Sequence, residues 1–176
     1  MSTIRILNGD DVEAYRTLRL RALREHPEAF GSSYEDEARM PVESVRASLQ
    51  DGPPDTAFFG VFEGDQLVGM TGLIRNQREK HRHRALVAAV YVEPQARGKG
   101  YARALLDAAL DHARVQEGLT DVVLAVTVGN MTARRLYINA GFAPYMVEPR
   151  YLKIGDTFYD MEWLRVRLDE PSEGRP

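Results

Sequence analysis

The sequence has no cysteine among its 176 residues. This absence excludes disulfide-bonded scaffolds, thiolate nucleophiles, thiol redox chemistry, and zinc or iron–sulfur sites held by cysteine. A strong excess of basic charge is also missing, because 23 Lys and Arg residues face 26 Asp and Glu residues and the formal net charge is -3. That balance is untypical of a dedicated nucleic-acid-binding protein, so we expect no nucleic-acid partner and a merely local site for any phosphate group.

Long apolar runs are lacking too. The longest, Ala85–Val92, is far shorter than the roughly 20 residues that cross a bilayer, and the N-terminal residues have no apolar signal core. We therefore expect a cytoplasmic protein without a membrane partner. A hydrophobic content of 44% with 28% charged residues is typical of a globular protein. We predict a single domain over residues 1–168 and a flexible tail, rich in charge, glycine and proline, over 169–176.

Hydrophobic periodicity and turn residues divide the chain into short elements. In chain order, we expect a strand over 3–7, a helix from a cap at residue 8 or 10 to about 25, a short helix from 41, a strand pair over 56–62 and 66–74, a buried strand over 86–92, a helix from 102, a strand over 122–128, a short helix over 131–140, and a strand pair over 142–154 and 157–168. The segment Phe30–Met40 looks exposed. Because each of the two buried strands precedes a helix, these strands should lie in parallel.

These elements predict an α/β fold, a three-layer α/β/α sandwich. Its sheet should be mixed and largely antiparallel, with about seven strands and with helices on both faces. The apolar stripe of the helix from residue 102 follows helical spacing, at Leu105, Leu106, Ala109, Leu110 and Ala113.

The chemistry is concentrated in the segment from Gln95 to Ala102, between the buried strand and that helix. Gly98 and Gly100 remove side chains, so that successive backbone N–H groups can point outward together. The N-terminus of the helix adds the positive end of its dipole, which favours an anion by about 0.3–1 kcal/mol. A pyrophosphate group fits this loop, with charge-assisted hydrogen bonds from Arg97 and Lys99 and without a metal ion.

Three other interpretations compete at this loop. A Walker loop needs Ser or Thr after its Gly-Lys pair, whereas Lys99 precedes Gly100. A dinucleotide fingerprint needs a third glycine where Arg103 stands. In the third interpretation, the glycines form only a tight turn from the strand to the helix.

Two motifs, in the right order, resemble those of the GNAT superfamily of N-acetyltransferases, of the small bacterial type. The first comprises Val90–Pro94, Arg97–Ala102, Leu105 and Leu106, and the second comprises Asn130, Ala133, Leu136, Tyr137, Gly141 and Phe142. The similarity extends over about Thr3 to Leu168, and the stretch Ala29–Glu35 also resembles a bacterial subset.

The resemblance implies an acyl-CoA N-acyltransferase fold in which the central parallel strands splay apart. It also implies acetyl-CoA as cosubstrate, with its pyrophosphate on the loop amides and its pantetheine arm paired with the buried strand like an additional strand. The implied cofactor-binding residues are Val90, Val92, Arg97, Gly98, Lys99, Gly100, Tyr101, Ala102 and Asn130. From the residues alone, Asn130 is equally an N-cap of the following helix.

The reaction implied is direct attack of an amine on the thioester carbonyl, through a tetrahedral oxyanion held by a backbone N–H near Val92. Tyr137 would act as general acid or as hydrogen-bond donor to the departing thiolate; alternatively it is a core residue. At the positions where relatives often carry a glutamate base, this sequence has Arg84 and Ala125. Glu35 and Glu148 are therefore candidate bases or anchors of a water relay, unless both are solvated surface charges.

Other charged segments have simpler structural interpretations. The basic run Arg75–Arg84 is expected to be a solvated hairpin loop, and its two histidines lack the further ligands of a metal site. Glu35–Glu37 should complement the dipole of the helix after Pro41, or form an entrance for a cationic amine. Loops around Tyr34, Arg75 and 145–151 are expected to form the acceptor pocket.

The acceptor is expected to be a small-molecule amine or a protein N-terminus, and a homodimer is left open. The alternative to an enzyme is a noncatalytic acyl-CoA-binding sensor module, which would keep the phosphate-binding loop without needing Tyr137.

Overall fold

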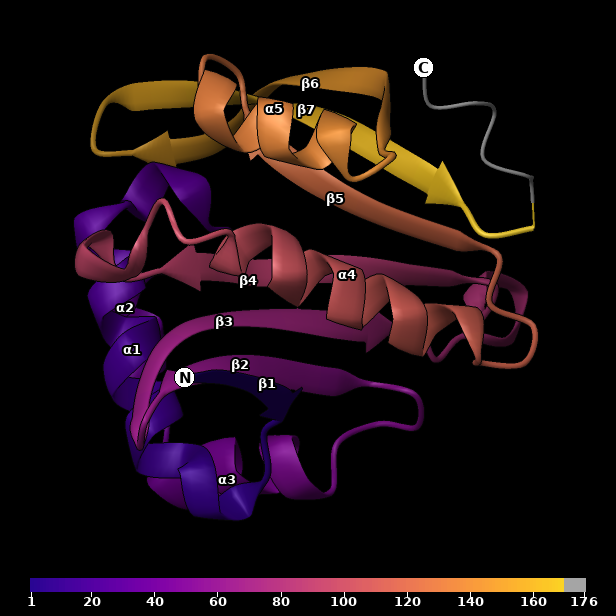
Figure 1. The fold of residues 1–176 in the computed structure, drawn as a ribbon. Helices are drawn as coiled ribbons and strands as arrows, with labels where there is room; N and C mark the ends of the chain where they lie inside the picture. The colour runs from indigo at the N-terminus through magenta and orange to yellow at the C-terminus, as the bar shows by residue number, and fades with distance from the viewer. Residues whose placement is uncertain (170–176) are drawn as a thin grey trace.

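A computed structural model of the chain describes residues 1–169 and contains an open seven-stranded sheet between two layers of helices (Figure 1). In spatial order the strands are β1 (Ser2–Ile6), β2 (Ala57–Glu63), β3 (Gln66–Arg75), β4 (Arg84–Val92), β5 (Asp121–Thr127), β7 (Thr157–Arg167) and β6 (Ala143–Ile154). The helices are α1 (Val12–Glu25), α2 (Tyr34–Ala38), α3 (Val42–Gln50), α4 (Tyr101–Arg114) and α5 (Met131–Asn139), with 3-10 turns η1 (Gly9–Asp11), η2 (Pro27–Ala29), η3 (Glu79–His81) and η4 (Pro94–Ala96).

This architecture confirms the predicted three-layer α/β/α class. The prediction of one domain over 1–168 stays a prediction, and all but Asp169 of the predicted tail lies outside the described residues. Within the described part of the chain, no helix is long and apolar enough to cross a membrane.

The neighbouring strands pair in antiparallel fashion except β4 and β5, which are parallel. Their pairing covers Arg84–Leu86 against Asp121–Val123 and then stops. Beyond it the two strands diverge toward their carboxyl ends, as Figure 1 shows on its left-hand side. The predicted splayed central pair is thus confirmed, and its open end leaves one edge of β4 without a neighbouring strand.

A β-bulge interrupts the pairing of β4 with β3 in the same stretch, on the edge opposite to the gap. Gly72 pairs with Ala88 and Met70 pairs with Tyr91, so that two residues of β4 face the single Thr71 of β3. Ala89, one of those two, has a left-handed φ of 55°, which a non-glycine residue rarely adopts. The bulge therefore places local backbone strain where β4 has lost β5 as its neighbour.

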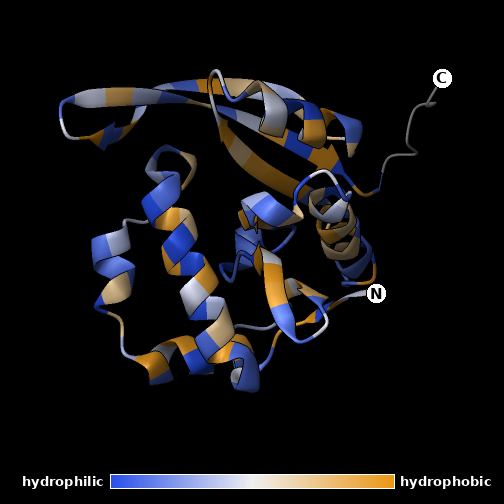
Figure 2. Ribbon diagram, turned by 60° about the vertical axis from the view of Figure 1, so that its left-hand side comes forward, coloured by the Kyte–Doolittle hydropathy of each residue, from blue (hydrophilic) through white to orange (hydrophobic). Residues whose placement is uncertain are grey.

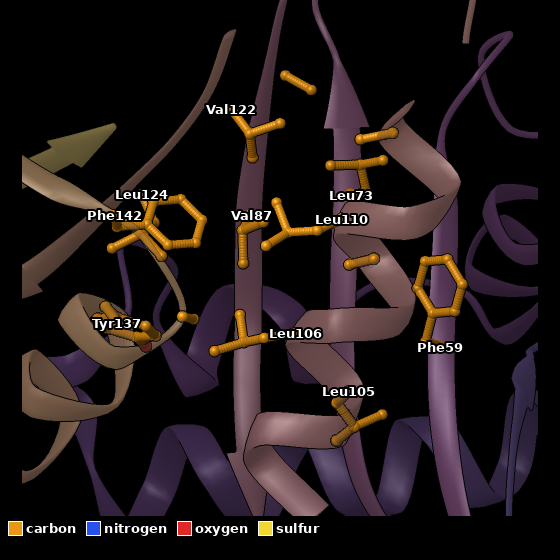
Figure 3. Close-up of a cluster of buried hydrophobic side chains, with 14 of the residues drawn as sticks. Phe59, Leu73, Val87, Leu105, Leu106, Leu110, Val122, Leu124, Tyr137 and Phe142 are labelled. Atoms are coloured by element: carbon orange, nitrogen blue, oxygen red, sulfur yellow. The ribbon is translucent and has the colours of Figure 1, made fainter. Parts of the chain in front are cut away.

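One layer consists of α4 and α5. The predicted stripe of α4 is fully buried against the sheet, where Leu106 and Leu110 meet Val87 (Figure 3). Tyr137 of α5 and Phe142 belong to the same cluster (Figure 3). The buried stripe thus holds α4 against the sheet. The preceding loop ends where α4 begins, at Tyr101.

The opposite layer consists of α1, α2 and α3 (Figure 2). A second cluster of buried apolar side chains joins this layer to the sheet. Tyr91 of β4 belongs to this second cluster, whereas Val87 and Val92 belong to the first. Both faces of β4 are therefore covered, as its nearly continuous apolar sequence indicated.

Two predicted boundaries near the N-terminus differ in the structure. Asn8 caps the 3-10 turn η1, and its side chain accepts a hydrogen bond from the Asp10 N–H at 2.8 Å. The α-helix α1 begins only afterwards, at Val12. The segment Phe30–Met40 contains α2, which the Ser33 hydroxyl caps by accepting a hydrogen bond from the Asp36 N–H at 3.1 Å.

The acidic residues of this segment therefore lie in the first turn of α2 itself, where they complement its dipole, and not ahead of α3. Pro41 precedes α3 rather than lying within its first turn.

The expectation that Arg75 lies in a solvated loop is wrong. This residue is 5% exposed, and its guanidinium donates to Asp55 at 2.7 Å, to the Arg82 carbonyl at 2.6 Å and to the Glu117 carbonyl at 2.8 Å. Arg75 also pairs with Ala85 in the sheet, so it lies at the closed end of the β4–β5 pair. Its role is to join three loops at that end.

Replacing Arg75 by methionine should lower the free energy of unfolding by about 3 kcal/mol, because Asp55 and two carbonyl oxygens lose a shared donor. Urea unfolding measures this change. Arg78→Met, at an exposed position of the same loop, is the control and should change stability by about 0.5 kcal/mol or less. Equal effects of the two substitutions would contradict the assignment.

Candidate functional site

A cavity of about 510 Å³ opens where β4 and β5 part, between the N-terminus of α4, the helix α5 and the end of α1. Its volume lies in the range typical of ligand pockets. Its lining includes Tyr137 and every predicted cofactor-binding residue except Lys99. The fold thus brings together residues from three separate segments of the sequence.

The loop at the mouth of this cavity presents unpaired backbone donors. Gly98 and Gly100 have φ values of 77° and 81°, which side-chain-bearing residues rarely adopt. Gly100 is the N-cap of α4 and offers no side-chain cap. Within the described residues, no group accepts a hydrogen bond from the backbone N–H groups of 98–103. A run of free N–H groups at the start of a 14-residue helix is suited to binding an anion.

Two basic side chains of the loop have protein partners. Arg97 Nε donates to the Val92 carbonyl at 3.0 Å, and its Nη2 lies 3.4 Å from His26 Nε2. This arginine therefore ties the loop to the ends of both β4 and α1.

Lys99 points away from the cavity, toward the β2–β3 hairpin. Its ammonium lies 2.6 Å from the Glu63 carboxylate, to which the Tyr101 hydroxyl also donates at 2.8 Å. The hydrogen bonds from Lys99 and then Tyr101 lower the pKa of Glu63, and the same pair raises the pKa of Lys99. A cofactor role for the Lys99 side chain stays a prediction.

Tyr137 and Asn130 reach the cavity from α5 and its cap. Burial raises the pKa of Tyr137 to about 12, so its hydroxyl stays protonated at neutral pH. In the described part of the chain no group forms a hydrogen bond with this hydroxyl, which leaves it to donate into the cavity. Asn130 accepts from the Ala133 N–H at 3.2 Å through its side-chain oxygen, so the N-cap interpretation holds and the side-chain NH₂ group remains for a ligand.

The far wall of the cavity comes from α1 and η2, which sequence reasoning did not place there. His26, Glu28 and Phe30 line it. Next to this wall, the Tyr91 hydroxyl donates to Glu25 at 2.6 Å, and burial followed by this hydrogen bond raises the pKa of Tyr91. The one signal in the sequence was the resemblance of residues 29–35 to a bacterial subset, which marked the segment without assigning roles.

The two candidate bases lie outside the lining of the cavity. Glu35 is an exposed residue of α2, and Glu148 is an exposed residue of the edge strand β6. Their roles stay predictions. Within residues 1–169, no group of three or more His, Asp or Glu side chains is arranged to hold a metal ion.

The open sheet with a parted parallel pair and a free anion loop at its mouth defines the acyl-CoA N-acyltransferase fold. Residues 17–142 match the model of the acetyltransferase (GNAT) family, and the chain belongs to this family. The resemblance seen in the two sequence motifs is thereby confirmed.

Curated relatives and solved structures agree with this assignment. A mycothiol acetyltransferase of Thermobispora bispora is 33% identical over 146 residues, which cover 81% of this chain and 46% of that protein. Another mycothiol acetyltransferase, from Geodermatophilus obscurus, is 30% identical over 91% of this chain and 46% of that protein. The chain therefore spans about half the length of these relatives.

Two solved structures share the fold. An acetyltransferase of the GNAT family from Streptococcus pneumoniae has a TM-score of 0.84 at 19% identity, covering 95% of this chain and 99% of that chain. The protein yncA from Salmonella typhimurium, solved with its cofactor acetyl-CoA, has a TM-score of 0.84 at 21% identity, covering 99% of this chain and 98% of that chain.

Substituting Gly100 by alanine should destabilise the protein by about 1–2 kcal/mol, because its φ of 81° is unfavourable for a residue with a Cβ although no atom lies within 4 Å of that Cβ. The same change should weaken coenzyme A binding by turning the loop amides. Gly31→Ala is the matched control, since that position has equal space and no left-handed φ. Urea unfolding and titration calorimetry check both effects, and equal behaviour of the two variants would rule out the conformational argument.

Proposed function

We propose that this chain is an N-acetyltransferase that moves the acetyl group of acetyl-CoA to a primary amine by direct attack. One observation carries the proposal, namely that the free N–H groups of the loop, the unpaired edge of β4 and the Tyr137 hydroxyl share one cavity. The free amides suit a pyrophosphate, the strand edge suits an extended amide-bearing arm, and the hydroxyl suits a departing thiolate.

The chain's own groups would hold acetyl-CoA as follows. The N–H groups between Arg97 and Ala102 receive the pyrophosphate, so no metal is required. The pantetheine arm extends along β4 at Val90 and Val92 as an additional strand, in the space that β5 leaves. Asn130 donates to that arm through its free NH₂ group.

In the chemical step the unprotonated amine nitrogen attacks the thioester carbon, and it then gives up one N–H proton to solvent. A backbone N–H near Val92 stabilises the oxyanion of the tetrahedral intermediate. When that intermediate collapses, the C–S bond breaks and the electron pair stays on sulfur. A thiol has a pKa near 8.5 and Tyr137 one of about 12, so complete proton transfer from Tyr137 is uphill by about 5 kcal/mol. Tyr137 therefore acts as a hydrogen-bond donor to the thiolate, with solvent supplying the final proton.

The test is a screen of amines with acetyl-CoA, covering free amino acids, polyamines, aminoglycosides and short peptides. Thiol release is followed and each acetylated product is identified by mass, which separates small-molecule acceptors from protein N-termini. Amine-stimulated thiol release is expected. Binding of acetyl-CoA without any product would favour the noncatalytic sensor module, and no binding of coenzyme A in calorimetry would refute both.

The variant Tyr137→Phe should keep the stability of the protein and its affinity for coenzyme A, since the lost hydroxyl has no partner in the described chain. Turnover should fall by about 10²–10⁴, the usual contribution of a positioned proton donor. Steady-state kinetics with the best amine of the screen measure it. Tyr159→Phe, on β7 and away from the cavity lining, is the control, and unchanged turnover in Tyr137→Phe would remove this residue from the mechanism.

The homodimer belongs to the same proposal. β6 is an edge strand whose residues are all exposed except Leu152, and its hairpin with β7 extends beyond the helices (Figure 2). Large exposed apolar side chains follow this hairpin, at Tyr145, Met146, Val147, Tyr151, Ile154 and Phe158. An apolar free edge is a template for a second chain, and a second copy presents the same edge.

The cytoplasmic location stays a prediction.

Val147→Asp should raise the dissociation constant of this dimer at least about 100-fold, because a buried carboxylate directly opposite Glu162 has no partner and costs several kcal/mol. Sedimentation equilibrium over a range of concentrations gives the constants. A wild-type protein that stays monomeric throughout that range would exclude the dimer.

A further inference from the structure

The charged residues that line the cavity point to the group that receives the acceptor. Arg97 and Arg103 come from the anion loop and α4, whereas Glu28 comes from η2. Of the described residues that line the cavity, Glu28 alone carries a carboxylate.

η2 is fixed across the open end of the parted strands. Its Glu28 carbonyl accepts a hydrogen bond from the Thr127 hydroxyl at 2.5 Å, at the end of β5. The turn itself continues from α1, whose cap His26 lies beside Arg97 near the end of β4. η2 therefore connects the ends of β4 and β5 on the side of the sheet opposite to α4 and α5. An amine that arrives from that side meets η2 before it meets the thioester.

The Glu28 side chain is both accessible and oriented. It is 41% exposed, so it can contact a ligand that enters from solvent, and its carboxylate lies 3.8 Å from His26 Nδ1. The other ring nitrogen, Nε2, lies 3.4 Å from the Arg97 guanidinium. Because a guanidinium can only donate, we assign the lone pair to Nε2 and the proton to Nδ1, which then faces Glu28. Arg97, His26 and Glu28 thus form a chain from the cofactor loop to η2.

We propose that the Glu28 carboxylate binds the acceptor as a cationic primary amine and accepts its proton, while His26 is a positioning residue. This inference rests on the proposed function. One N–H proton of the ammonium moves to a Glu28 oxygen, and the nitrogen lone pair forms the C–N bond. The C–S bond then breaks with its electron pair on sulfur, and the nitrogen releases a second proton as the neutral amide forms. The thiolate takes up one proton through solvent, and Glu28 returns its own proton to solvent. The carboxylate also supplies what Arg84 and Ala125 cannot, since neither side chain can accept a proton.

The decisive variant is Glu28→Gln, which keeps the shape of the side chain and removes its charge. Its kcat/KM for the best amine should fall about 100-fold or more, the usual size of a general-base contribution. The KM for acetyl-CoA and the urea midpoint of unfolding should not change. If Glu28 had a purely structural role, the substitution would change these two quantities as well. Glu28→Asp should recover part of the loss. Glu43→Gln, on the exposed surface of α3, is the matched control and should behave as wild type.

The comparison also includes Glu35→Gln and Glu148→Gln. An unchanged kcat/KM in Glu28→Gln would overturn the inference, as would an equal loss in either of the other two variants or a parallel loss of acetyl-CoA binding in Glu28→Gln. The turnover of the wild-type protein separates a failure of this inference from a failure of the proposed function. If the wild-type protein acetylates an amine and Glu28→Gln does so equally well, this inference alone falls, whereas a wild type inactive on every amine refutes the proposed function as well.

Discussion

Three residue pairs join β4 to β5 in parallel, and beyond them the facing backbone groups of the two strands have no sheet partner. Buried backbone donors and acceptors are costly when unpaired, so this arrangement persists only where a ligand or solvent completes the hydrogen bonds. The remaining features of the site follow from it. The cavity forms because the strands part, the bulge at Ala89 falls on the same stretch, and η2 connects the two ends that have separated.

Particular side-chain contacts hold the closed end of the β4–β5 pair, as they do the open end. Arg75 joins three loops there, and the ion pair of Arg165 with Asp121, at 3.7 Å, ties β7 to the start of β5. At the opposite end Arg97 lines the cavity and donates to the Val92 carbonyl, whereas Lys99 pairs with Glu63 and points away from the cavity. Basic residues that look equivalent in the sequence therefore divide into those that hold the fold and those that face the cavity.

Much of the fold could be predicted because its signals are local. The stripe of α4, the continuous apolar run of β4 and the order of buried strand and helix fixed the central layers, and the glycine loop marked the anion site. The far wall of the cavity could not be predicted in this way. His26 and Glu28 reach the site through tertiary contacts with Arg97 and Thr127, which are separated from them by 71 and 99 residues. Arg75 was misread for the same reason, since its partners come from distant loops.

Beyond its short pairing with β5, β4 is paired along one edge only, so its backbone N–H groups are of two kinds. Some N–H groups within Ala88–Val92 face β3 while others face the gap, although the bulge at Ala89 breaks their regular alternation. In hydrogen exchange those paired with β3 should be protected like the rest of the sheet, whereas those on the gap side should exchange freely until an added strand covers them. A single strand would then report occupancy of the cleft by the contrast between its two edges, with the β3 side as its internal reference.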